Sequence, residues 1–186
     1  MKSILAFSHD LLKEVIKEGD LAIDATVGNG NDTKLLAELV GQTGRVIGFD
    51  IQEEGLKRTQ EKLSKTALDT RVSLLHKGHE TVSEVLDEDD EIAAAIFNLG
   101  YLPKSDKSII TLPETTLEAC RGILKQLKKG GRLVMVIYHG HVGGDEEREA
   151  VTQFFQDLPQ EEFHVIRYGF INQINNPPFI VACERR

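Results

Sequence analysis

The sequence predicts an α/β fold with a mostly parallel seven-stranded sheet, helices on both of its faces and an antiparallel hairpin at its C-terminal end. Short segments rich in Val, Ile and Ala alternate with helical patterns as far as residue 157, as in parallel sheets that are covered on both faces. A glycine-rich turn separates the first such strand from the helix that follows it. The last two apolar segments are only seven residues apart, which is too short for a parallel crossover and therefore predicts the hairpin.

The expected elements follow in order along the chain. Apolar residues at helical spacing, from Leu11 to Ile16, predict an N-terminal helix for which Ser8 is available as a cap and which ends before Gly19. The segments with strand character are 21–26, 45–50, 72–76, 92–98, 131–139, 163–171 and 179–185. The helical patterns between them cover 31–40, 53–65, 80–86, 111–128 and 145–157. The order is thus a series of βα units followed by the hairpin.

Length and composition suit one domain, residues 1–186, because a chain of 186 residues that is 40% hydrophobic lies within the usual domain range. The formal net charge of −8 argues against a uniformly basic surface, so any contact with nucleic acid must be local. Cys120 and Cys183 have neither CxxC nor metal-ligand spacing and are expected to be buried. Because the chain shows no signal-peptide pattern and no membrane-length apolar run, we expect a cytoplasmic protein that makes no membrane contact.

The glycine-rich turn lies in the stretch DATVGNGNDT, residues 24–33. Glycine tolerates positive φ and has no side chain, so Gly28 and Gly30 let the backbone approach a ligand closely. The next strand ends in Asp50, twenty residues after Gly30, where a carboxylate can accept hydrogen bonds from both hydroxyls of a ribose. Many doubly wound folds carry such a turn for structural reasons alone, but together the two features predict a cofactor that contains adenosine.

NAD and S-adenosylmethionine both contain adenosine, and the acidic residues of the turn distinguish them. A diphosphate favours a helix N-terminus that is free of negative charge. Asp32 would repel a diphosphate there but suits a sulfonium and an α-amino group, and Asp24 adds a second acceptor for the cationic methionine portion. The C-terminal hairpin also fits a methyltransferase sheet better than a two-halved dinucleotide domain. The residues therefore favour S-adenosylmethionine as the cofactor.

With these residues the chain resembles the Rossmann-like class I S-adenosylmethionine-dependent methyltransferases and, among them, the YtqB-like or MnmM family, long described as rRNA methylases. The resemblance runs nearly end to end, through FSHDLL, DATVGNGNDT, GFDIQ, GHE, FNLGYLP, YHGHVGG and NQINNPP in that order. NLGYLP together with YHGHVGG is far more specific than the glycine loop. The resemblance implies N-methylation of the aminomethyl group of the tRNA wobble uridine, which converts 5-aminomethyl-2-thiouridine into 5-methylaminomethyl-2-thiouridine.

The resemblance also implies which residues hold the cofactor. The methionine portion would be lined by the turn residues Gly28, Asn29, Gly30, Asn31 and Asp32. Asp50 would bind the ribose, and Gln52 could reach the ribose or the adenine edge unless it is a surface residue of the following helix. His79 and Glu80 follow the third expected strand, where related enzymes contact adenine, and a capped helix start is the alternative for this pair.

Asn98 ends the fourth expected strand and begins the motif NLGYLP. It lies at the switch in strand order between the first and fourth strands, where ligands bind in open α/β sheets. The Asn98 side-chain oxygen and the Leu99 carbonyl can accept hydrogen bonds from an incoming amine. Amino-methylating enzymes commonly have Asn or Asp followed by Pro-Pro-Tyr here, and NLGYLP resembles that motif with a looser spacing. The alternative is an Asn that ends a strand in a turn.

Tyr138, His139 and His141 follow the fifth expected strand and form a candidate substrate wall. A primary amine is largely protonated at neutral pH, so His139 or His141 is the candidate base. Tyr138 or Tyr101 could stack on the substrate base. Structural histidines are the alternative, and no metal site is predicted because no third ligand is evident from the sequence.

The implied partner is the anticodon region of tRNA, where unpaired bases can be splayed and stacked with few phosphate contacts. The candidate RNA-binding residues are Lys104 and Lys107, beside the active-site loop, and Asn175 in the hairpin connection, for which a rigid turn is the alternative. Three other interpretations stay open: a small-molecule amine N-methyltransferase, a methyltransferase acting on rRNA, and an RNA-binding module with a vestigial cofactor pocket. A homodimer also stays open.

Overall fold

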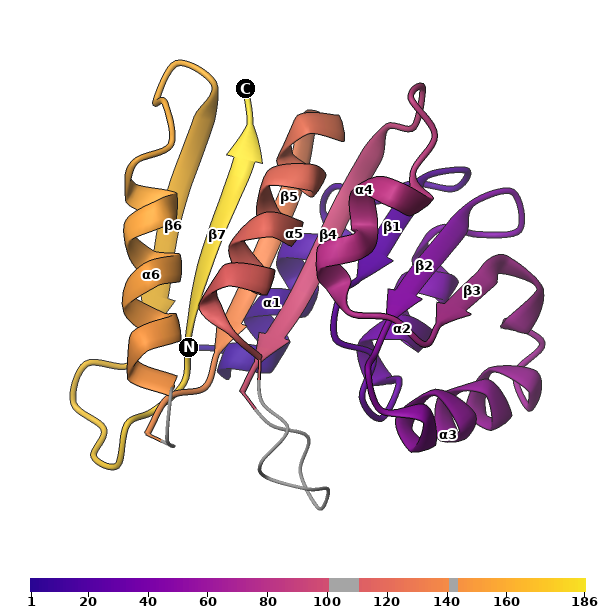
Figure 1. Cartoon of the computed structure of the whole chain (residues 1–186), viewed down its shortest axis with the longest axis horizontal. Helices are drawn as coiled ribbons and strands as arrows, with labels where there is room; N and C mark the ends of the chain where they lie inside the picture. Colours follow the sequence, from indigo (N-terminus) through magenta and orange to yellow (C-terminus); the bar gives the residue numbers. More distant parts are fainter. Residues whose placement is uncertain (101–110, 141–143) are drawn as a thin grey trace.

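A computed structural model describes residues 1–100, 111–140 and 144–186, and it has a seven-stranded sheet of order β3-β2-β1-β4-β5-β7-β6 (Figure 1). The strands are β1 (Leu21–Asp24), β2 (Arg45–Phe49), β3 (Val72–Leu75), β4 (Ile92–Leu99), β5 (Leu127–Ile137), β6 (Phe163–Gly169) and β7 (Phe179–Arg185). Strands β1 to β5 are parallel, whereas β7 is antiparallel to both β5 and β6. The predicted parallel sheet with a terminal antiparallel hairpin is confirmed.

The helices cover both faces of the sheet, with α5 and α6 in front of it and α1 and α2 behind it in the view of Figure 1. They are α1 (Ile4–Lys13), α2 (Asn31–Leu39), α3 (Glu53–Ser64), α4 (Val82–Val85), α5 (Pro113–Gln126) and α6 (Gly144–Gln156), with single 3-10 turns η1 (Asp69–Arg71) and η2 (His79–Thr81). Each face has its own apolar core, one shared with α1 and α2 and the other with α5 and α6. Among the described residues, no helix is long and apolar enough to cross a membrane.

Alternation along the strands assigns each side chain to one of these two cores. In β4, Ile96 packs in the core of α1 and α2, whereas Phe97 packs in the core of α5 and α6. In β5, Val136 belongs to the first core and Ile137 to the second. The same alternation decides on which face of the sheet the polar residues just beyond the ends of β4 and β5 lie.

Three boundaries differ from the sequence predictions. Helix α1 begins at Ile4, and Ser3 rather than Ser8 is its N-cap, since the Ser3 hydroxyl accepts a hydrogen bond from Ala6 N–H. Ser8 is fully buried and donates to the Leu5 carbonyl at 2.9 Å. Strand β5 begins at Leu127, earlier than expected, and the helix expected over 80–86 is divided into η2 and α4. Both expected buried cysteines, Cys120 and Cys183, are buried.

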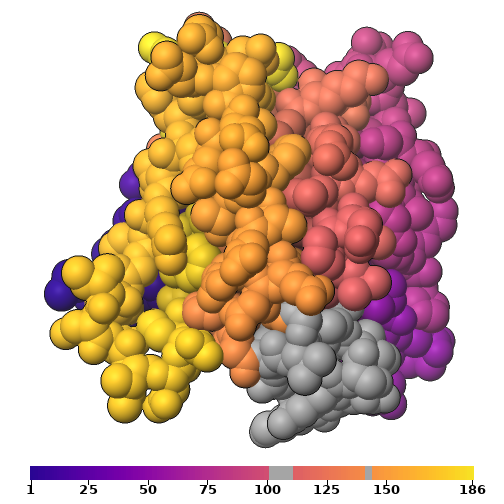
Figure 2. Space-filling model, turned by 60° about the vertical axis from the view of Figure 1, so that its left-hand side comes forward, coloured from indigo at the N-terminus to yellow at the C-terminus, as the bar shows by residue number. Residues whose placement is uncertain are grey.

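The strand order reverses between β1 and β4, which are hydrogen-bonded neighbours although β2 and β3 intervene in the sequence. The carboxyl ends of both strands therefore lie at one edge of the sheet, the lower edge in Figure 1. The connection between β6 and β7, residues 170–178, projects at the same edge and is visible at the lower left of Figure 2. This edge gathers most of the predicted site residues that the structure describes.

Candidate active site

The glycine loop between β1 and α2 needs glycine at two positions for conformational and steric reasons. Gly28 and Gly30 have φ values of 52° and 68°, in the left-handed region that favours glycine. A Cβ atom on Gly30 would lie 2.4 Å from Thr59 Oγ1 of α3. On the other side, the lack of a side chain at Gly55 lets α3 approach the Gly28 carbonyl, because a Cβ there would lie 2.8 Å from that oxygen. The loop is thus packed directly against α3.

Thr33 occupies the place where a dinucleotide motif would have its third glycine, and it binds Asp24. The Thr33 hydroxyl donates to Asp24 Oδ2 at 2.6 Å, and Thr26 N–H donates to Asp24 Oδ1 at 3.2 Å. Asp24 is fully buried, and this burial, with the negative charge of Asp32 adding to it, raises the pKa of Asp24 to about 7. The sequence predicts that Asp24 faces the cofactor, whereas the structure places Asp24 beneath the glycine loop, where its hydrogen bonds support the loop.

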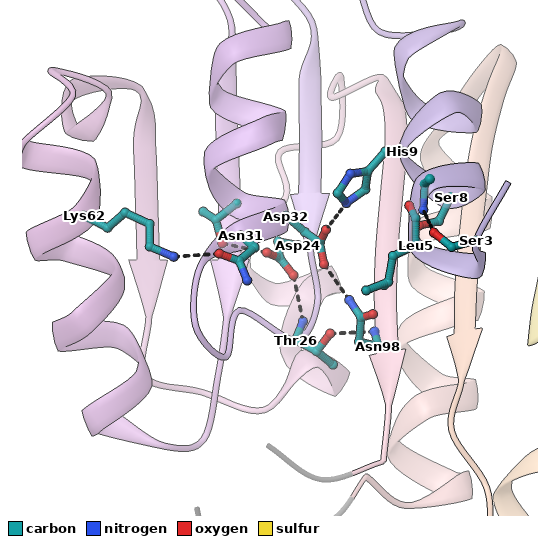
Figure 3. A network of polar contacts seen from close by, with 12 residues as sticks. Ser3, Leu5, Ser8, His9, Asp24, Thr26, Asn31, Asp32, Lys62 and Asn98 are labelled. Carbon is teal, nitrogen blue, oxygen red and sulfur yellow. Dashed lines mark hydrogen bonds and ion pairs between the residues drawn. The ribbon is translucent and has the colours of Figure 1, made fainter. Parts of the chain in front are cut away.

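Asp32 joins three elements at the N-terminus of α2 (Figure 3). Its Oδ1 lies 2.6 Å from His9 Nε2 of α1, and its Oδ2 accepts from the Asn98 side-chain amide of β4 at 2.7 Å. Sequence reasoning identified Asp32 and Asn98 but assigned no role to His9. The stretch FSHDLL was noticed only as part of the family resemblance, because nothing local shows that a helix before the first strand reaches this site.

Asn98 is held at both its backbone and its side chain. Its N–H donates to Thr26 Oγ1 at 2.7 Å, and its amide nitrogen is directed to Asp32. The amide oxygen of Asn98, the expected amine acceptor, has no partner among the described residues. The other expected acceptor, the Leu99 carbonyl, already accepts from Tyr138 N–H at 3.1 Å as part of the sheet. Of the two expected amine acceptors, the Asn98 oxygen is therefore the one that stays open among the described residues.

Asp50 lies at the end of β2, as predicted, and its carboxylate binds two backbone groups. It accepts from Gly28 N–H at 2.6 Å and from Gln52 N–H at 2.8 Å. A carboxylate has about four lone-pair sites, so about two of them remain for further donors. Gln52 is the N-cap residue of α3 and lies directly beside this carboxylate. The pair is positioned to receive hydroxyl groups next to the glycine loop.

His79 begins η2 but is buried rather than directed to the edge of the sheet. Its Nδ1 lies 3.1 Å from the Ala25 carbonyl, its ring packs edge-on against Phe97, and burial lowers its pKa below the ordinary histidine value. His79 is thus a neutral histidine of the core, which agrees with the structural alternative rather than with adenine contact. Glu80 is only partly buried, and its carboxylate lies over Gly78, where a Cβ atom would be 2.2 Å from it.

Tyr138 and His139 extend from β5 toward opposite faces of the sheet. Burial raises the pKa of Tyr138 above the ordinary tyrosine value, with the nearby Asp32 charge adding to it, so the phenol stays protonated at neutral pH. His139 instead packs edge-on against Phe179, and its Nε2 lies 3.2 Å from the Pro177 carbonyl. The structure therefore separates two residues that were predicted to form one substrate wall: Tyr138 lies near Asp32, and His139 contacts the hairpin connection.

The outer side of the glycine loop is held by Lys62 of α3, which sequence reasoning missed. The Lys62 ammonium donates to Asn31 Oδ1 at 2.8 Å (Figure 3). It also donates to the Asn29 carbonyl, and both asparagines are exposed. Partial burial and the charge of Lys34 lower the pKa of Lys62. The basic side chain is thus bound to two residues of the loop, Asn29 and Asn31.

The remaining predicted residues lie apart from this cluster or outside the described residues. Asn175 is exposed in the connection between β6 and β7, with a left-handed φ of 64°. Tyr101, Lys104, Lys107 and His141 lie outside the described residues. The predictions made for these four therefore remain predictions.

The donors and acceptors of this edge fit S-adenosylmethionine. Asp50 has acceptor capacity for ribose hydroxyls, and Asp32 places a negative charge at the N-terminus of α2, where a sulfonium or an amino group would be stabilised. The same charge would disfavour a diphosphate at that helix end. The chemistry of these residues therefore agrees with a cationic methyl donor.

Comparisons with known proteins agree with this assignment. A family model described as "Putative rRNA methylase" matches residues 46–184. The chain is 35% identical, over 99% of its length and 70% of the relative's, to the "tRNA (mnm(5)s(2)U34)-methyltransferase, chloroplastic" of Arabidopsis thaliana. A crystal structure titled "putative rRNA-methylase" from Clostridium thermocellum is 46% identical, with a TM-score of 0.97 over 100% of this chain and 99% of that one.

A second solved structure links the fold to the methyl donor's product. The SMU.1697c methyltransferase of Streptococcus mutans, crystallised in complex with SAH, is 44% identical with a TM-score of 0.91, and the match covers 100% of this chain and 99% of that one. The family match, the full-length relatives and the acidic cofactor edge are mutually consistent. The chain belongs to the family described as putative rRNA methylases and is an S-adenosylmethionine-dependent methyltransferase.

Proposed function

We propose that this enzyme methylates the aminomethyl group of the wobble uridine of tRNA, converting 5-aminomethyl-2-thiouridine into 5-methylaminomethyl-2-thiouridine. The name of the Arabidopsis thaliana relative, which the chain matches over 99% of its length, supports this substrate. The structure also supports an amine as the methyl acceptor. The observation that supports it best is the arrangement of Asn98 at the end of β4.

The Asn98 amide nitrogen donates to Asp32, so the amide oxygen is the atom left for a substrate. An amide oxygen accepts hydrogen bonds from N–H groups, and in doing so it can direct the lone pair of an amine. The backbone N–H of Asn98 is also held by Thr26, so the residue is fixed at its backbone as well as at its side chain. This geometry suits the alignment of a primary amine.

The bound S-adenosylmethionine supplies an electrophilic methyl group with a good leaving group. The enzyme's residues have to hold the neutral amine in line at about 3 to 3.5 Å from the methyl carbon, which is the usual near-attack distance. The amine lone pair forms the new N–C bond as the S–C bond breaks and its electron pair returns to sulfur. One proton of the substrate ammonium passes to solvent before attack, and methyl transfer to the neutral amine then gives a secondary ammonium. Asp32 stabilises the cationic groups that gather around Asn98.

The tRNA contact is proposed at the same edge of the sheet. The connection between β6 and β7, which contains the exposed Asn175, projects there, and an unpaired anticodon base can be recognised with few phosphate contacts. This agrees with the net charge of −8, which disfavours a broad electrostatic interface. Contact with the anticodon region, a cytoplasmic location, a single domain and a homodimer remain part of the proposal.

Mass spectrometry of nucleosides tests the proposal directly. We expect tRNA from a deletion strain to accumulate 5-aminomethyl-2-thiouridine, and the wild-type gene but not Asn98→Ala to restore the methylated nucleoside. Nucleosides from rRNA of the same strains serve as the comparison. Unchanged tRNA nucleosides together with a lost rRNA methyl group would move the activity to rRNA. Unchanged nucleosides in both RNAs would point to a small-molecule amine.

A further inference from the structure

Helix α1 precedes the first strand, yet it reaches the methyl-transfer site through one side chain. His9 Nε2 lies 2.6 Å from Asp32 Oδ1, and the side chains of His9 and Asp32 keep 29% and 13% of their exposure. The contact joins residues 23 positions apart in the chain. Neither the sequence motifs nor the cofactor assignment gives His9 a role.

The chemistry of the groups fixes the direction of each hydrogen bond. An ionised carboxylate only accepts, so Asp32 requires a proton on His9 Nε2 and the nitrogen rather than the oxygen of the Asn98 amide. Each Asp32 oxygen thus has its own donor, one from α1 and one from β4. If the His9 donor were absent, the carboxylate could rotate, and the Asn98 amide would lose its fixed partner.

Helix α1 is anchored independently of the glycine loop, which makes it a firm support for His9. Arg132 of β5 donates to the Leu11 carbonyl at 3.0 Å, and the Tyr168 hydroxyl of β6 donates to the Lys2 carbonyl at 2.7 Å. The Phe7 ring stacks on Tyr168 with centroids 4.1 Å apart. These contacts tie α1 to the C-terminal half of the sheet, so His9 links that half to the cofactor loop.

We propose that His9 is a positioning residue that holds the Asp32 carboxylate and, through it, turns the Asn98 amide oxygen toward the substrate amine. The role of the Asn98 oxygen rests on the proposed function, whereas the orientation of the Asn98 amide does not. His9 acts through Asp32 and has no assigned contact with substrate. The first turns of α1 are therefore part of the active site.

Two amide substitutions at position 9 distinguish a role of the hydrogen bond to Asp32 from a role of side-chain packing alone. In His9→Gln, the amide nitrogen occupies the same place along the side chain as Nε2 and can donate to Asp32. In His9→Asn, the amide corresponds to Nδ1 and is too short to reach Asp32. His9→Phe keeps the ring without a donor, and His164→Phe, at an exposed position of β6, is the matched control.

The first measurement needs no substrate. In the full-length protein bound to S-adenosylmethionine, the side-chain NH₂ resonances of Asn98, assigned by their loss in Asn98→Ala, report the bond to Asp32. We expect these resonances to shift in His9→Asn and His9→Phe and to stay near their wild-type positions in His9→Gln and His164→Phe. Unshifted resonances in all His9 variants would overturn the proposal.

The second measurement is turnover at saturating substrate. We expect kcat to fall about tenfold in His9→Asn and His9→Phe, because misplacement of an acceptor lowers the rate of an oriented reaction, with His9→Gln recovering most of the loss. Calorimetry should show the affinity for S-adenosylmethionine changed by less than about threefold, since Asp32 keeps its charge beside the cofactor in every His9 variant and the proposed defect lies in amine alignment. An equal fall of kcat in His9→Gln and His9→Asn would indicate that His9 acts through packing alone and would overturn the proposal. A wild-type enzyme that does not methylate tRNA carrying 5-aminomethyl-2-thiouridine would refute the proposed substrate, while the resonances would still decide the role of His9.

Discussion

The carboxyl ends of β1 and β5 both lead into a polar stretch that contains glycine, but the two stretches are organised differently. After β1, the polar side chains are directed to one another: Thr33 and Thr26 bind Asp24, and Asp32 binds His9 and Asn98. After β5, consecutive residues separate, with Tyr138 near Asp32 and His139 against Phe179 on the other face. The first region is a network, whereas the second is divided between two faces of the sheet.

The difference teaches how far a local motif predicts a site. A loop that precedes a helix brings several successive residues around one centre, so its composition is a reliable guide to its ligand. A strand end alternates between faces, so adjacent residues there have different neighbours. The buried residues of β5 show which side chains point to which face, since Val136 and Ile137 already belong to different cores.

The largest effect is expected from filling the space at Gly30. Gly30→Ala adds a Cβ that meets Thr59 and imposes a left-handed φ on a residue with a side chain. We expect the free energy of unfolding to fall by about 2 to 5 kcal/mol, the sum of backbone strain and overpacking. Calorimetric titration should show weaker binding of S-adenosylmethionine, because the loop has to shift.

Gly130→Ala is the matched control for this change. Gly130 also has a positive φ, 75°, but a Cβ there meets nothing within 4 Å. It should therefore show only the backbone strain, roughly 1 to 2 kcal/mol, without a change in cofactor binding. Equal losses of stability in the two variants would mean that contact with Thr59 is not what makes glycine necessary in the loop.

An intermediate effect is expected from the charge of the buried Asp24. Its pKa is raised to about 7, so between about pH 4 and pH 7 the folded state binds a proton that the unfolded state has released. This contribution to stability is complete below the unfolded pKa and is lost as the pH rises through the folded pKa. Asp24→Asn keeps an amide that can pair with Thr26 and Thr33 but removes the titration.

Chemical denaturation at pH 5 and at pH 8 measures the difference. Relative to wild type, Asp24→Asn should gain stability on going from pH 5 to pH 8, by on the order of 2 kcal/mol, since one pKa unit corresponds to about 1.4 kcal/mol. Asp89→Asn, in an exposed acidic turn, should show no such trend. A pH-independent difference for Asp24→Asn would show that Asp24 does not titrate in this range.

The smallest effect distinguishes the two residues after β5. Tyr138→Phe removes a hydroxyl from the Asp32 side and should lower kcat about tenfold, a size typical of a lost polar contact at a reacting centre. His139→Phe keeps the ring against Phe179 and loses one hydrogen bond to Pro177, so kcat should stay within about threefold and stability should fall by about 1 kcal/mol.

Steady-state kinetics of the two variants, together with their thermal unfolding, makes the comparison. A larger loss of kcat in His139→Phe than in Tyr138→Phe would restore His139 as the base that the sequence suggested. It would also mean that the side of the sheet facing α6 takes part in the reaction. The contrast between the network after β1 and the divided residues after β5 would then no longer hold.

Local patterns in the sequence were sufficient for the sheet class, the terminal hairpin, the glycine loop and the positions of Asp32, Asp50 and Asn98. These features depend on hydrophobic periodicity, on the short connection before β7 and on the alternation of strands and helices along the chain, all of which are visible in local stretches of the sequence. The acidic character of the loop was likewise enough to favour a cationic cofactor. Each of these inferences needs only a window of chain or the known geometry of a parallel sheet.

Tertiary structure alone decided which of these residues touch. The contacts of Asp32 with His9 and Asn98 join positions 23 and 66 residues apart, and the burial of Asp24 and His79 depends on helices packed over them. The opposite directions of Tyr138 and His139 depend on which residues of β5 point to each face of the sheet. The physical reason is that a side chain's partner and charge state are set by whatever packs around it, and packing brings together parts of the chain that no local pattern relates.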